Sequence, residues 1–345
     1  MEVYKIAFTG GPCAGKTRTI DFVKGKLEKD GYYVITIPET ARNLITSKLL
    51  PNDQDREHTM RFQNYVIRMQ TVKEKIAEEY AEGLKNKQFD FIKDKKAIII
   101  LYDRSIIDNR GYLNQDDYEC LLQKYNYEEI KFMDKFDMVI DLISTATTDK
   151  NLYCLDEERN EPDDIASKID QEISTAWSMH HNIKVLKPRI KIEDKYEDVL
   201  NCFSGLLESY SESNAKKLLI DENNTDLSYY NETNSRKIRI TNICLAKSFD
   251  MNYVVVKRQY NGCTSYISNI DTVNHSNMRP ISYGRYLETI STYGIVSTED
   301  MEVINVIDKG NHYKLYNDYN KGLWFIEFDE DKNFIFPKHV KVKTK

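Results

Sequence analysis

The sequence predicts an α/β protein built in two parts. Over the first 190 residues, short apolar runs alternate with segments of helical periodicity, which is typical of a parallel sheet wrapped by helices. After Pro188, apolar and polar residues alternate between turns rich in Gly, Asn and Asp, which indicates an antiparallel β domain. A chain of 345 residues is also longer than one ordinary domain.

The first part contains the strand candidates of a parallel sheet. One of them, the run 97–102, is apolar throughout, as expected of a strand buried on both faces. In chain order the candidates are residues 3–9, 32–39, 97–102, 137–143 and 183–186.

Helix candidates occupy the segments between these strands. A helix is expected at 16–29, a longer one at 59–86 and another within 156–177. Apolar residues recur at helical spacing in the last two, which indicates amphipathic helices. The stripe of the longer helix is Phe62, Val66, Met69, Val72 and Ile76, and that of the later helix is Ile165, Ile169, Ile173 and Trp177.

The second part follows a connecting helix at 193–207. Residues 1–192 are expected to form the first domain, and residues 208–345 the second. Runs that alternate with a period of two predict its strands. They are residues 236–246, 252–259, 264–270, 312–319 and 322–329.

Composition indicates where the protein is expected to be located and which classes of partner are not expected to bind it. With 41% hydrophobic and 30% charged residues the chain resembles a soluble globular protein, and no apolar run is long enough to span a bilayer. The first residues form a strand pattern instead of a secretory leader, so a cytoplasmic location is expected. The formal net charge of −6 argues against a nucleic-acid partner. The six cysteines have no metal-binding spacing.

A glycine-rich stretch between the first strand and the first helix carries the strongest functional signal. Residues 10–17, GGPCAGKT, match the phosphate-binding pattern G-x-x-x-x-G-K-[ST]. Backbone amides of such a loop surround phosphate oxygens, its lysine reaches the terminal phosphates, and its hydroxyl holds Mg²⁺. We therefore expect ATP or GTP to bind here. The expected contacts are Gly10, Gly11, Pro12, Cys13, Ala14, Gly15, Lys16, Thr17 and Arg18.

Two carboxylates follow neighbouring strands at the same edge of the predicted sheet. Asp103 is expected to join Thr17 in holding Mg²⁺; the alternative is that it caps the next helix. Glu39 is expected to accept a proton from a substrate hydroxyl, or to hold that hydroxyl by a hydrogen bond. Its alternative is a carboxylate at a helix start.

Arg159 is a candidate lid residue, because a mobile arginine can place positive charge over the migrating phosphoryl group. Its alternative is a surface ion pair with the glutamates around it. Together with Lys16, Glu39 and Asp103, it completes the predicted catalytic set. His180 and His181 have no partner at ligand spacing, so we expect a surface pair.

The motifs GGPCAGKT, IPETAR, DRSIIDNRGYL and ERNEPDDIASKIDQEISTAWSMH resemble those of P-loop kinases related to nicotinamide-riboside and deoxynucleoside kinases. The resemblance covers residues 3–190. It implies that Glu39 contacts the acceptor hydroxyl, and that Asp103 and Arg104 form the acidic-Arg-Ser motif of those kinases.

The second part resembles the CYTH, or triphosphate-tunnel, domain, an antiparallel barrel that binds organic phosphates. The similarity lies in two stretches, KRQYNGCTSY at 257–266 and RPISYGRY at 279–286. The resemblance assigns the second stretch to a basic turn. The diagnostic E-x-E-x-K reads ESNAK, with Asn214 in place of a metal-binding carboxylate, so triphosphate hydrolysis is not expected. The phosphate ligands that the resemblance implies are Lys257, Arg258, Arg279 and Arg285.

The two parts in this order resemble the GTP-binding proteins named for defective translocation of the TRPL photoreceptor channel. That family implies GTP, phosphoinositides and membrane trafficking. Two functions follow: a Mg²⁺-dependent kinase acting on a small hydroxyl acceptor, or a GTP-binding regulator with little turnover that docks on phosphoinositide at membranes. The last nine residues, PKHVKVKTK, contain four lysines. They are expected either to bind phosphorylated lipid head groups or to lie in a solvated strand and tail. The residues themselves do not choose between ATP and GTP, since the N-K-x-D guanine motif is absent.

Overall fold

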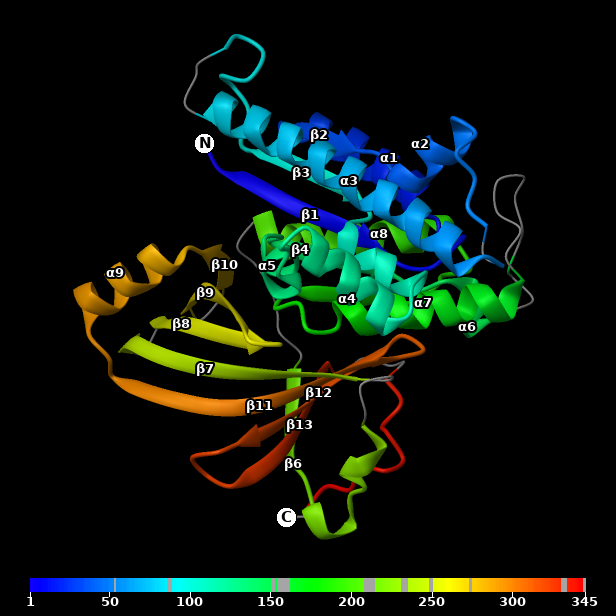
Figure 1. The fold of residues 1–345 in the computed structure, drawn as a ribbon. Helices are drawn as coiled ribbons and strands as arrows, with labels where there is room; N and C mark the ends of the chain where they lie inside the picture. The colour runs from blue at the N-terminus through cyan, green and yellow to red at the C-terminus, as the bar shows by residue number, and fades with distance from the viewer. Residues whose placement is uncertain are drawn as a thin grey trace.

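The computed structural model describes residues 1–52, 54–85, 89–149, 153, 162–207, 215–230, 235–247, 251–272, 275–329 and 334–343. These residues form a five-stranded sheet of order β2-β3-β1-β4-β5 and an eight-stranded sheet of order β10-β9-β8-β7-β11-β12-β13-β6 (Figure 1). Neighbouring strands are parallel in the first sheet and antiparallel in the second, so the predicted fold class is confirmed.

Every strand expected in the first part is present. The bounds are β1 (Val3–Thr9), β2 (Tyr33–Ile37), β3 (Ile98–Asp103), β4 (Met138–Leu142) and β5 (Ile183–Leu186). Strand order changes direction at β1, which has β3 on one side and β4 on the other. Because ligands of open parallel sheets bind at the carboxyl edge where the order reverses, the loop after β1 is at the favoured position.

Helices cover both faces of the parallel sheet. Residues of β3 alternate between the faces: Ile98 and Ile100 contact the side of α3 (Arg56–Lys85) and α7 (Asp163–Trp177), and Ile99 and Leu101 the other side. On that other side lie α1 (Lys16–Lys29) and α8 (Ile192–Leu207). The sheet is therefore buried on both faces, which explains its continuous apolar strands.

Helix α3 does not bury the stripe that its sequence predicted. Phe62 and Val66 are buried, but Met69, Val72 and Ile76 are 37%, 57% and 61% exposed. The inner face is continued instead by Ile67, Ala81 and Leu84, together with two buried polar residues that bind polar groups of the first part. Gln70 contacts Thr40 Oγ1 and the carbonyl of Arg104, and Glu74 accepts from Lys135.

Several short helices lie outside the predicted pattern. They are α2 (Thr40–Thr46), η1 (Ile106–Gly111), α4 (Gln115–Lys124), α5 (Glu129–Asp134), α6 (Thr145–Thr148), η3 (Glu222–Asn224), η4 (Leu227–Tyr229) and α9 (Tyr283–Tyr293). Helix α9 replaces the expected basic turn, and its N-cap Ser282 accepts a hydrogen bond from the amide of Arg285.

The second sheet contains all five predicted strand runs and three further strands. Its bounds are β6 (Ala215–Leu219), β7 (Arg236–Lys247), β8 (Met251–Tyr260), β9 (Cys263–Thr272), β10 (His275–Ile281), β11 (Ser297–Asp308), β12 (Asn311–Asp318) and β13 (Leu323–Asp329). Pattern reading missed β6, β10 and β11. The polar start of β11, STED, obscures its strand pattern, although it pairs with both β7 and β12.

Three arginines join the second sheet to the first part of the chain; Arg236 and Arg258 are buried, and the Arg279 side chain is 25% exposed. Arg258 on β8 binds Asp134 at the end of α5, and Arg279 Nε on β10 lies 2.8 Å from Asp137 Oδ1. Arg236 Nη2 on β7 lies 4.0 Å from Glu129 Oε1. Helices α5 and α7 pack against this sheet.

His180 and His181 are buried at the same junction. The side chain of His181 is 4% exposed and its Nδ1 is 3.5 Å from Asp134 Oδ1. The expectation of a surface pair is therefore wrong. Burial lowers the pKa of both imidazoles.

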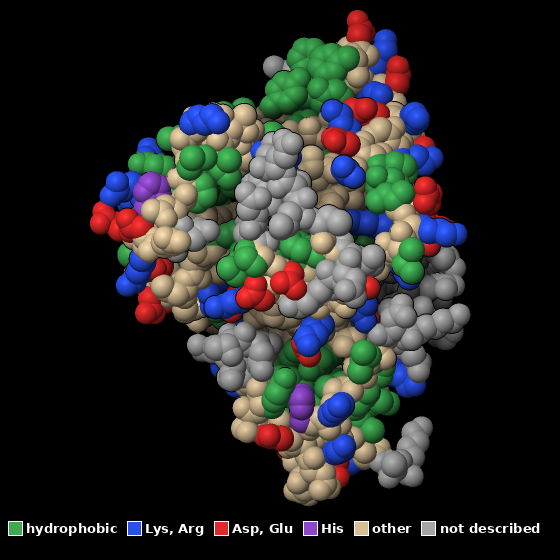
Figure 2. All heavy atoms as spheres, turned by 90° about the vertical axis from the view of Figure 1, so that its right-hand side faces the viewer, with side chains coloured by type: hydrophobic (Ala, Val, Ile, Leu, Met, Phe, Trp, Pro, Cys, Tyr) green, Lys and Arg blue, Asp and Glu red, His purple; other side chains and the backbone are tan. Residues whose placement is uncertain are grey.

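Among the described residues, no helix is both long and apolar enough to cross a membrane. On the face drawn in Figure 2, acidic and basic side chains are interspersed and hydrophobic side chains gather in separate groups.

Candidate functional site

The loop between β1 and α1 requires glycine at two positions. Gly10 has a φ of +124°, and a Cβ there would lie 2.1 Å from the carbonyl oxygen of Leu142 on β4. Gly15, with a φ of +75°, immediately precedes α1. Side chains would strain the backbone at both positions, so the glycines allow the loop to turn back over the sheet edge.

Lys16 is folded against its own loop. Its ammonium donates to the carbonyl oxygens of Gly10 and Gly11, at 2.9 and 2.7 Å, and the residue is only 4% exposed. Main-chain carbonyls are weaker partners for an ammonium than phosphate oxygens, because only the phosphate carries a formal negative charge.

Thr17 and Asp103 form a pair of oxygen ligands beside this lysine. Thr17 Oγ1 donates to Asp103 Oδ2 at 2.7 Å, whereas Asp103 Oδ1 is buried with no hydrogen-bond partner in the described part of the chain. Burial, and then the charge of Glu39, raises the pKa of Asp103. A hydroxyl and a carboxylate suit a hard divalent cation, and the unsatisfied oxygen leaves a coordination position open.

Asp103 does not cap the helix that follows it. The N-cap of η1 is Ser105, and its amide donates to Asp108 Oδ2 at 3.0 Å. Asp108 also accepts from Thr9 Oγ1 at 2.6 Å and from Trp177 Nε1 at 3.2 Å. The carboxylate of Asp103 is thus left facing the loop.

Glu39 lies at the same edge, at the end of β2. It occupies the N-cap position of α2, but its side chain makes no capping hydrogen bond. Its Oε1 accepts from Arg104 Nε at 2.9 Å, and its Oε2 lies 3.8 Å from Arg42 Nε. Arg104 also donates to the carbonyl of Gly10 at 3.1 Å, so it connects Glu39 to the loop.

Two residues at the loop were not predicted as site residues, although Asp170 lies within a motif of the kinase resemblance. Asp170 on α7 accepts from the amide of Gly11 at 2.6 Å and from Thr147 Oγ1, which fixes the outer turn of the loop. Lys195 on α8 donates to the carbonyl of Ala14 at 2.6 Å. Both come from distant segments, and only the fold brings them to the loop.

Lys195 is a cation without a carboxylate partner within the part of the chain that the structure describes. Its Nζ would lie 2.9 Å from a Cβ at Gly15. Burial lowers the pKa of Lys195 to about 8, and no neighbouring negative charge opposes this shift. Stacking of Tyr196 on Phe22, with ring centroids 3.9 Å apart, fixes α8 against α1 at this point.

The remaining predicted residues are distributed as follows. Pro12 accepts from Ser144 Oγ at 2.7 Å, Cys13 adopts a positive φ of 55°, and Arg18 is exposed on the first turn of α1. Arg159 lies outside the described residues.

The four basic residues predicted for the second part do not converge. Arg258 and Arg279 are bound to Asp134 and Asp137, and Arg285 forms an exposed ion pair with Glu288 on α9. Lys257 neighbours Arg258 on one strand, and successive strand residues point to opposite faces. These residues form no common site in the structure, because Arg258, Arg279 and Arg285 each have a separate partner.

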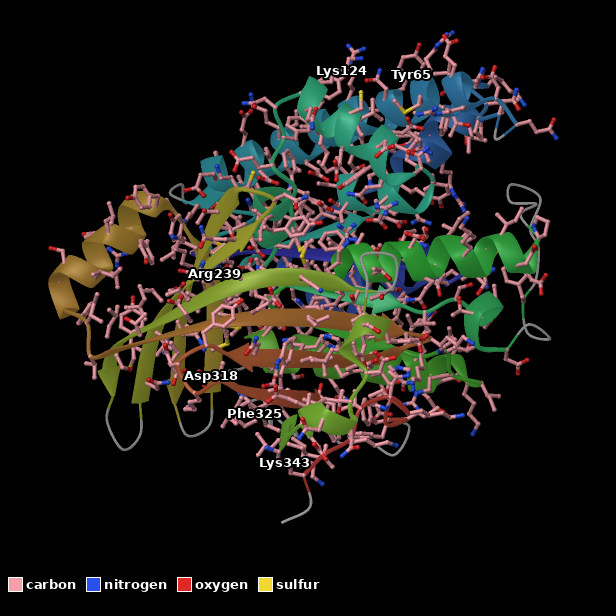
Figure 3. All side chains as sticks on the ribbon, turned by 60° about the horizontal axis from the view of Figure 1, so that its bottom comes forward. Tyr65, Lys124, Arg239, Asp318, Phe325 and Lys343 are labelled. Carbon is pink, nitrogen blue, oxygen red and sulfur yellow. The ribbon has the colours of Figure 1, made fainter. Side chains whose placement is uncertain are left out.

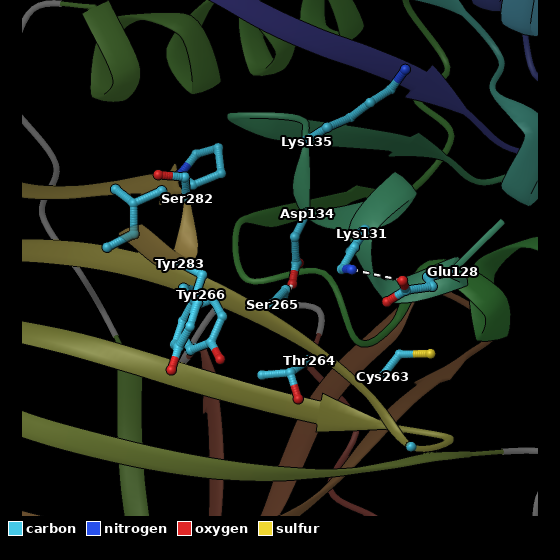
Figure 4. A pocket seen from close by; sticks show the side chains of 13 residues that line it. Glu128, Lys131, Asp134, Lys135, Cys263, Thr264, Ser265, Tyr266, Ser282 and Tyr283 are labelled. Carbon is cyan, nitrogen blue, oxygen red and sulfur yellow. Dashed lines mark hydrogen bonds and ion pairs between the residues drawn. The ribbon is translucent and has the colours of Figure 1, made fainter. Parts of the chain in front are cut away.

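A cavity of about 620 Å³ lies between α5 and β9–β10, away from the loop of residues 10–17, which we call the P-loop (Figure 4). Its charged groups are already paired: Lys131 with Glu128 at 2.6 Å, Lys135 with Glu74, and Asp134 with Arg258. Tyr266 and Tyr283 stand side by side on its other wall. No unpaired charge selects a ligand class, so the P-loop edge remains the candidate site.

The fold and this loop define a P-loop protein with a nucleotide-binding, kinase-like domain. Residues 5–195, more than half of the chain, match the family described as "AAA domain". The chain belongs to that family. A search of curated proteins gives no match.

Solved structures resemble each part separately. Thymidylate kinase from Ehrlichia chaffeensis is 15% identical over 59% of this chain and 99% of its own, with a TM-score of 0.35. The enzyme from Candida albicans is 13% identical over 59% and 92%, with a TM-score of 0.38. An inorganic triphosphatase is 9% identical over 37% and 86%, with a TM-score of 0.27. At these scores the fold assignment rests on the strand order described above.

Proposed function

We propose that this protein is a Mg²⁺-dependent kinase that transfers the terminal phosphoryl group of ATP or GTP to a small hydroxyl acceptor. The observation that carries the proposal is the cluster at the carboxyl edge of β1, β2 and β3. There Lys16, the Thr17–Asp103 pair and the Glu39–Arg104 pair lie together around one loop. A cation, a metal-binding pair and an adjacent carboxylate are the parts that phosphoryl transfer requires.

The loop amides and Lys16 bind and orient the triphosphate. Lys16 exchanges its bonds to Gly10 and Gly11 for phosphate oxygens, where its charge stabilises the transition state more than the ground state. Lys195 adds a second positive charge on the outer side of the loop. A bound anion would offset the unfavourable burial of that ammonium.

Thr17 and Asp103 fit Mg²⁺ by ligand chemistry, since both offer oxygen and Asp103 Oδ1 has no other partner among the described residues. The bound ion would supply positive charge to the phosphate oxygens. Glu39 would accept the proton of the acceptor hydroxyl, with Arg104 holding the carboxylate in place. The open Oδ1 of Asp103 supports its expected role as a metal ligand. The hydrogen bond from Arg104 to Glu39 supports the expected role of Glu39 as the proton acceptor.

The test is a transfer assay with labelled ATP or GTP, Mg²⁺ and a panel of nucleosides and other small alcohols. Glu39→Gln should lower turnover about 100-fold while triphosphate binding, measured by calorimetry, is kept. Lys16→Met should abolish the binding heat, and Lys29→Met, at the far end of the same helix, should change neither property. Binding without any phosphorylated product would contradict the kinase. Absence of heat with both triphosphates would contradict nucleotide binding itself.

The alternative is a GTP-binding regulator whose CYTH-like second part binds phosphoinositide. Its support is the resemblance of that part to phosphate-binding barrels. Phosphoinositide would have to displace Asp134 and Asp137 from Arg258 and Arg279. Liposomes with and without phosphoinositide test it: equal retention of the protein on both would exclude this function.

A further inference from the structure

The outer side of α3 carries a continuous apolar stripe. Its members are spaced by three or four residues and are between 37% and 61% exposed: Tyr65, Met69, Val72, Ile76 and Tyr80. Fifteen residues of helix rise about 22 Å, so the stripe runs along four turns. Figure 3 shows Tyr65 at the outer surface of the molecule, on the side away from the second sheet.

This orientation cannot be reversed by rotating the helix. The inner face packs Ile67, Ala81 and Leu84 into the main core. It also holds Gln70, which contacts Thr40 and Arg104, and Glu74, which accepts from Lys135; the two residues are 2% and 1% exposed. Turning the outer stripe inward would break these contacts, so α3 has apolar residues on both its buried and its exposed side.

The apolar surface continues beyond the helix. Tyr80 is hydrogen-bonded to Tyr33, which raises the pKa of Tyr33 to about 12. The Tyr33 ring lies 5.7 Å from that of Phe91, and Phe91 lies 5.5 Å from Phe89. Phe89 and Phe91 are 41% and 51% exposed. Contiguous exposed apolar surface of this extent marks an interaction site in soluble proteins.

The charges beside the stripe identify the partner. Arg61, Arg68 and Glu79 are seven and eleven residues apart, which is two and three helical turns, so they share one edge of the stripe. The same edge also carries Glu57, Lys75 and Glu82, so its net charge is +1 over Glu57, Arg61 and Arg68 and −1 over Lys75, Glu79 and Glu82. A two-fold axis that pairs two such helices antiparallel brings each edge against the same edge of its copy, with opposite charges opposed. Their present partners, Glu57 and Lys75, are exposed neighbours on the same helix, and such pairs are weak.

We propose that the protein forms a homodimer in which α3 packs antiparallel against α3 of a second copy, with the two-fold axis near Val72. Met69 and Ile76 of one copy then lie against Ile76 and Met69 of the other. Tyr65 and Tyr80 cover the ends of the contact. Arg68 of each copy faces Glu79 of its partner.

Sedimentation of the full chain over a range of concentrations tests the proposal. The parent should dimerise below about 10 µM, and Val72→Glu/Ile76→Glu should raise the dissociation constant at least 100-fold. Ile190→Glu is the matched control, because Ile190 is 96% exposed but lies outside the stripe, and it should leave dimerisation unchanged. Far-ultraviolet circular dichroism should show that all variants remain folded. A parent that stays monomeric at about 100 µM, or a stripe variant that dimerises like the parent, would overturn the proposal.

A charge exchange tests the antiparallel arrangement directly. Arg68→Glu and Glu79→Arg should each weaken the dimer about tenfold, because each places like charges opposite one another. Together they should restore most of the parent affinity. Failure of the double variant to recover would rule out this pairing of the helices even if the stripe variant dissociates.

Discussion

Positively charged side chains have different partners at the P-loop and at the junction between the two sheets. At the junction, the guanidinium groups of Arg258 and Arg279 are each paired with a carboxylate. At the P-loop, Lys16 donates to carbonyls of its own loop and Lys195 to the carbonyl of Ala14. The two junction guanidinium groups thus face formal negative charges, whereas the two P-loop ammonium groups donate to carbonyls that carry none. Phosphate oxygens would be stronger partners for both lysines than these carbonyls are.

The largest effect is expected from a substitution that removes an ion pair at the junction. Arg258→Met leaves the buried carboxylate of Asp134 without its guanidinium, so the free energy of unfolding should fall by about 3–5 kcal/mol. Burial by itself would raise the pKa of Asp134, but Arg258 and His181 outweigh it and hold that pKa below its ordinary value. Denaturant unfolding measures the loss. An unfolding free energy within about 0.5 kcal/mol of the parent would mean that this pair resembles an exposed one.

Lys195→Met tests the P-loop side of this comparison. The stability of the ligand-free protein and its affinity for ATP or GTP should change in opposite directions. Lys195 keeps its ordinary pKa of 10.5 in the unfolded chain and about 8 in the folded protein, so the unfolded chain binds more protons between these values. Stability therefore rises with pH across that window, and near pH 7 the buried charge is a cost.

Removing that charge should raise the melting temperature of the ligand-free protein by a few degrees. It should also weaken ATP or GTP binding about tenfold, as measured by calorimetry. Lys195→Arg should retain most of the affinity. Equal weakening by both substitutions, or a melting temperature that falls with Met, would show that Lys195 is only a packing residue.

The smallest effect concerns Asp103 and pH. Because its pKa is raised, Asp103 should lose its charge at a higher pH than an ordinary aspartate does. The Mg²⁺-dependent gain in nucleotide affinity should decline a few-fold on acidification, beginning above the usual carboxyl range. In the ligand-free protein the sign is reversed, since the folded state holds this proton more tightly than the unfolded chain and is stabilised as pH falls. Asp103→Asn should remove the pH dependence of the Mg²⁺ effect, but it should only reduce that of stability, because burial also raises the pKa of Asp141 and Asp170. A Mg²⁺ effect that keeps its pH profile in this variant would assign the titration to another group.

Much of the fold was predictable because its signals are local. The continuous apolar run at 97–102 indicated a buried strand, and the glycine pattern before Lys16 placed the loop between a strand and a helix. The positions of Asp103 and Glu39 at one edge followed from the rule that parallel strands end together.

The failures have one physical cause, which is tertiary contact between distant segments. The stripe on α3 is periodic, but periodicity does not say which face will be buried. The core contacts of Ile67 and Ala81 and the hydrogen bonds of Gln70 and Glu74 lie on another face. Arg258 resembled a phosphate ligand in its local motif, yet Asp134, far away in sequence, already binds it. Asp170 lies within a motif of the kinase resemblance but had no predicted role, and Lys195 belongs to none of those motifs.

The arginine pairs across the sheet junction also determine how this chain can be cut. Expression of residues 1–207 alone would leave Glu129, Asp134 and Asp137 on a newly exposed surface without their cations, and the isolated second sheet would carry the matching uncompensated guanidinium groups. The halves are therefore poor independent fragments, and heating the intact chain should melt both in a single cooperative step.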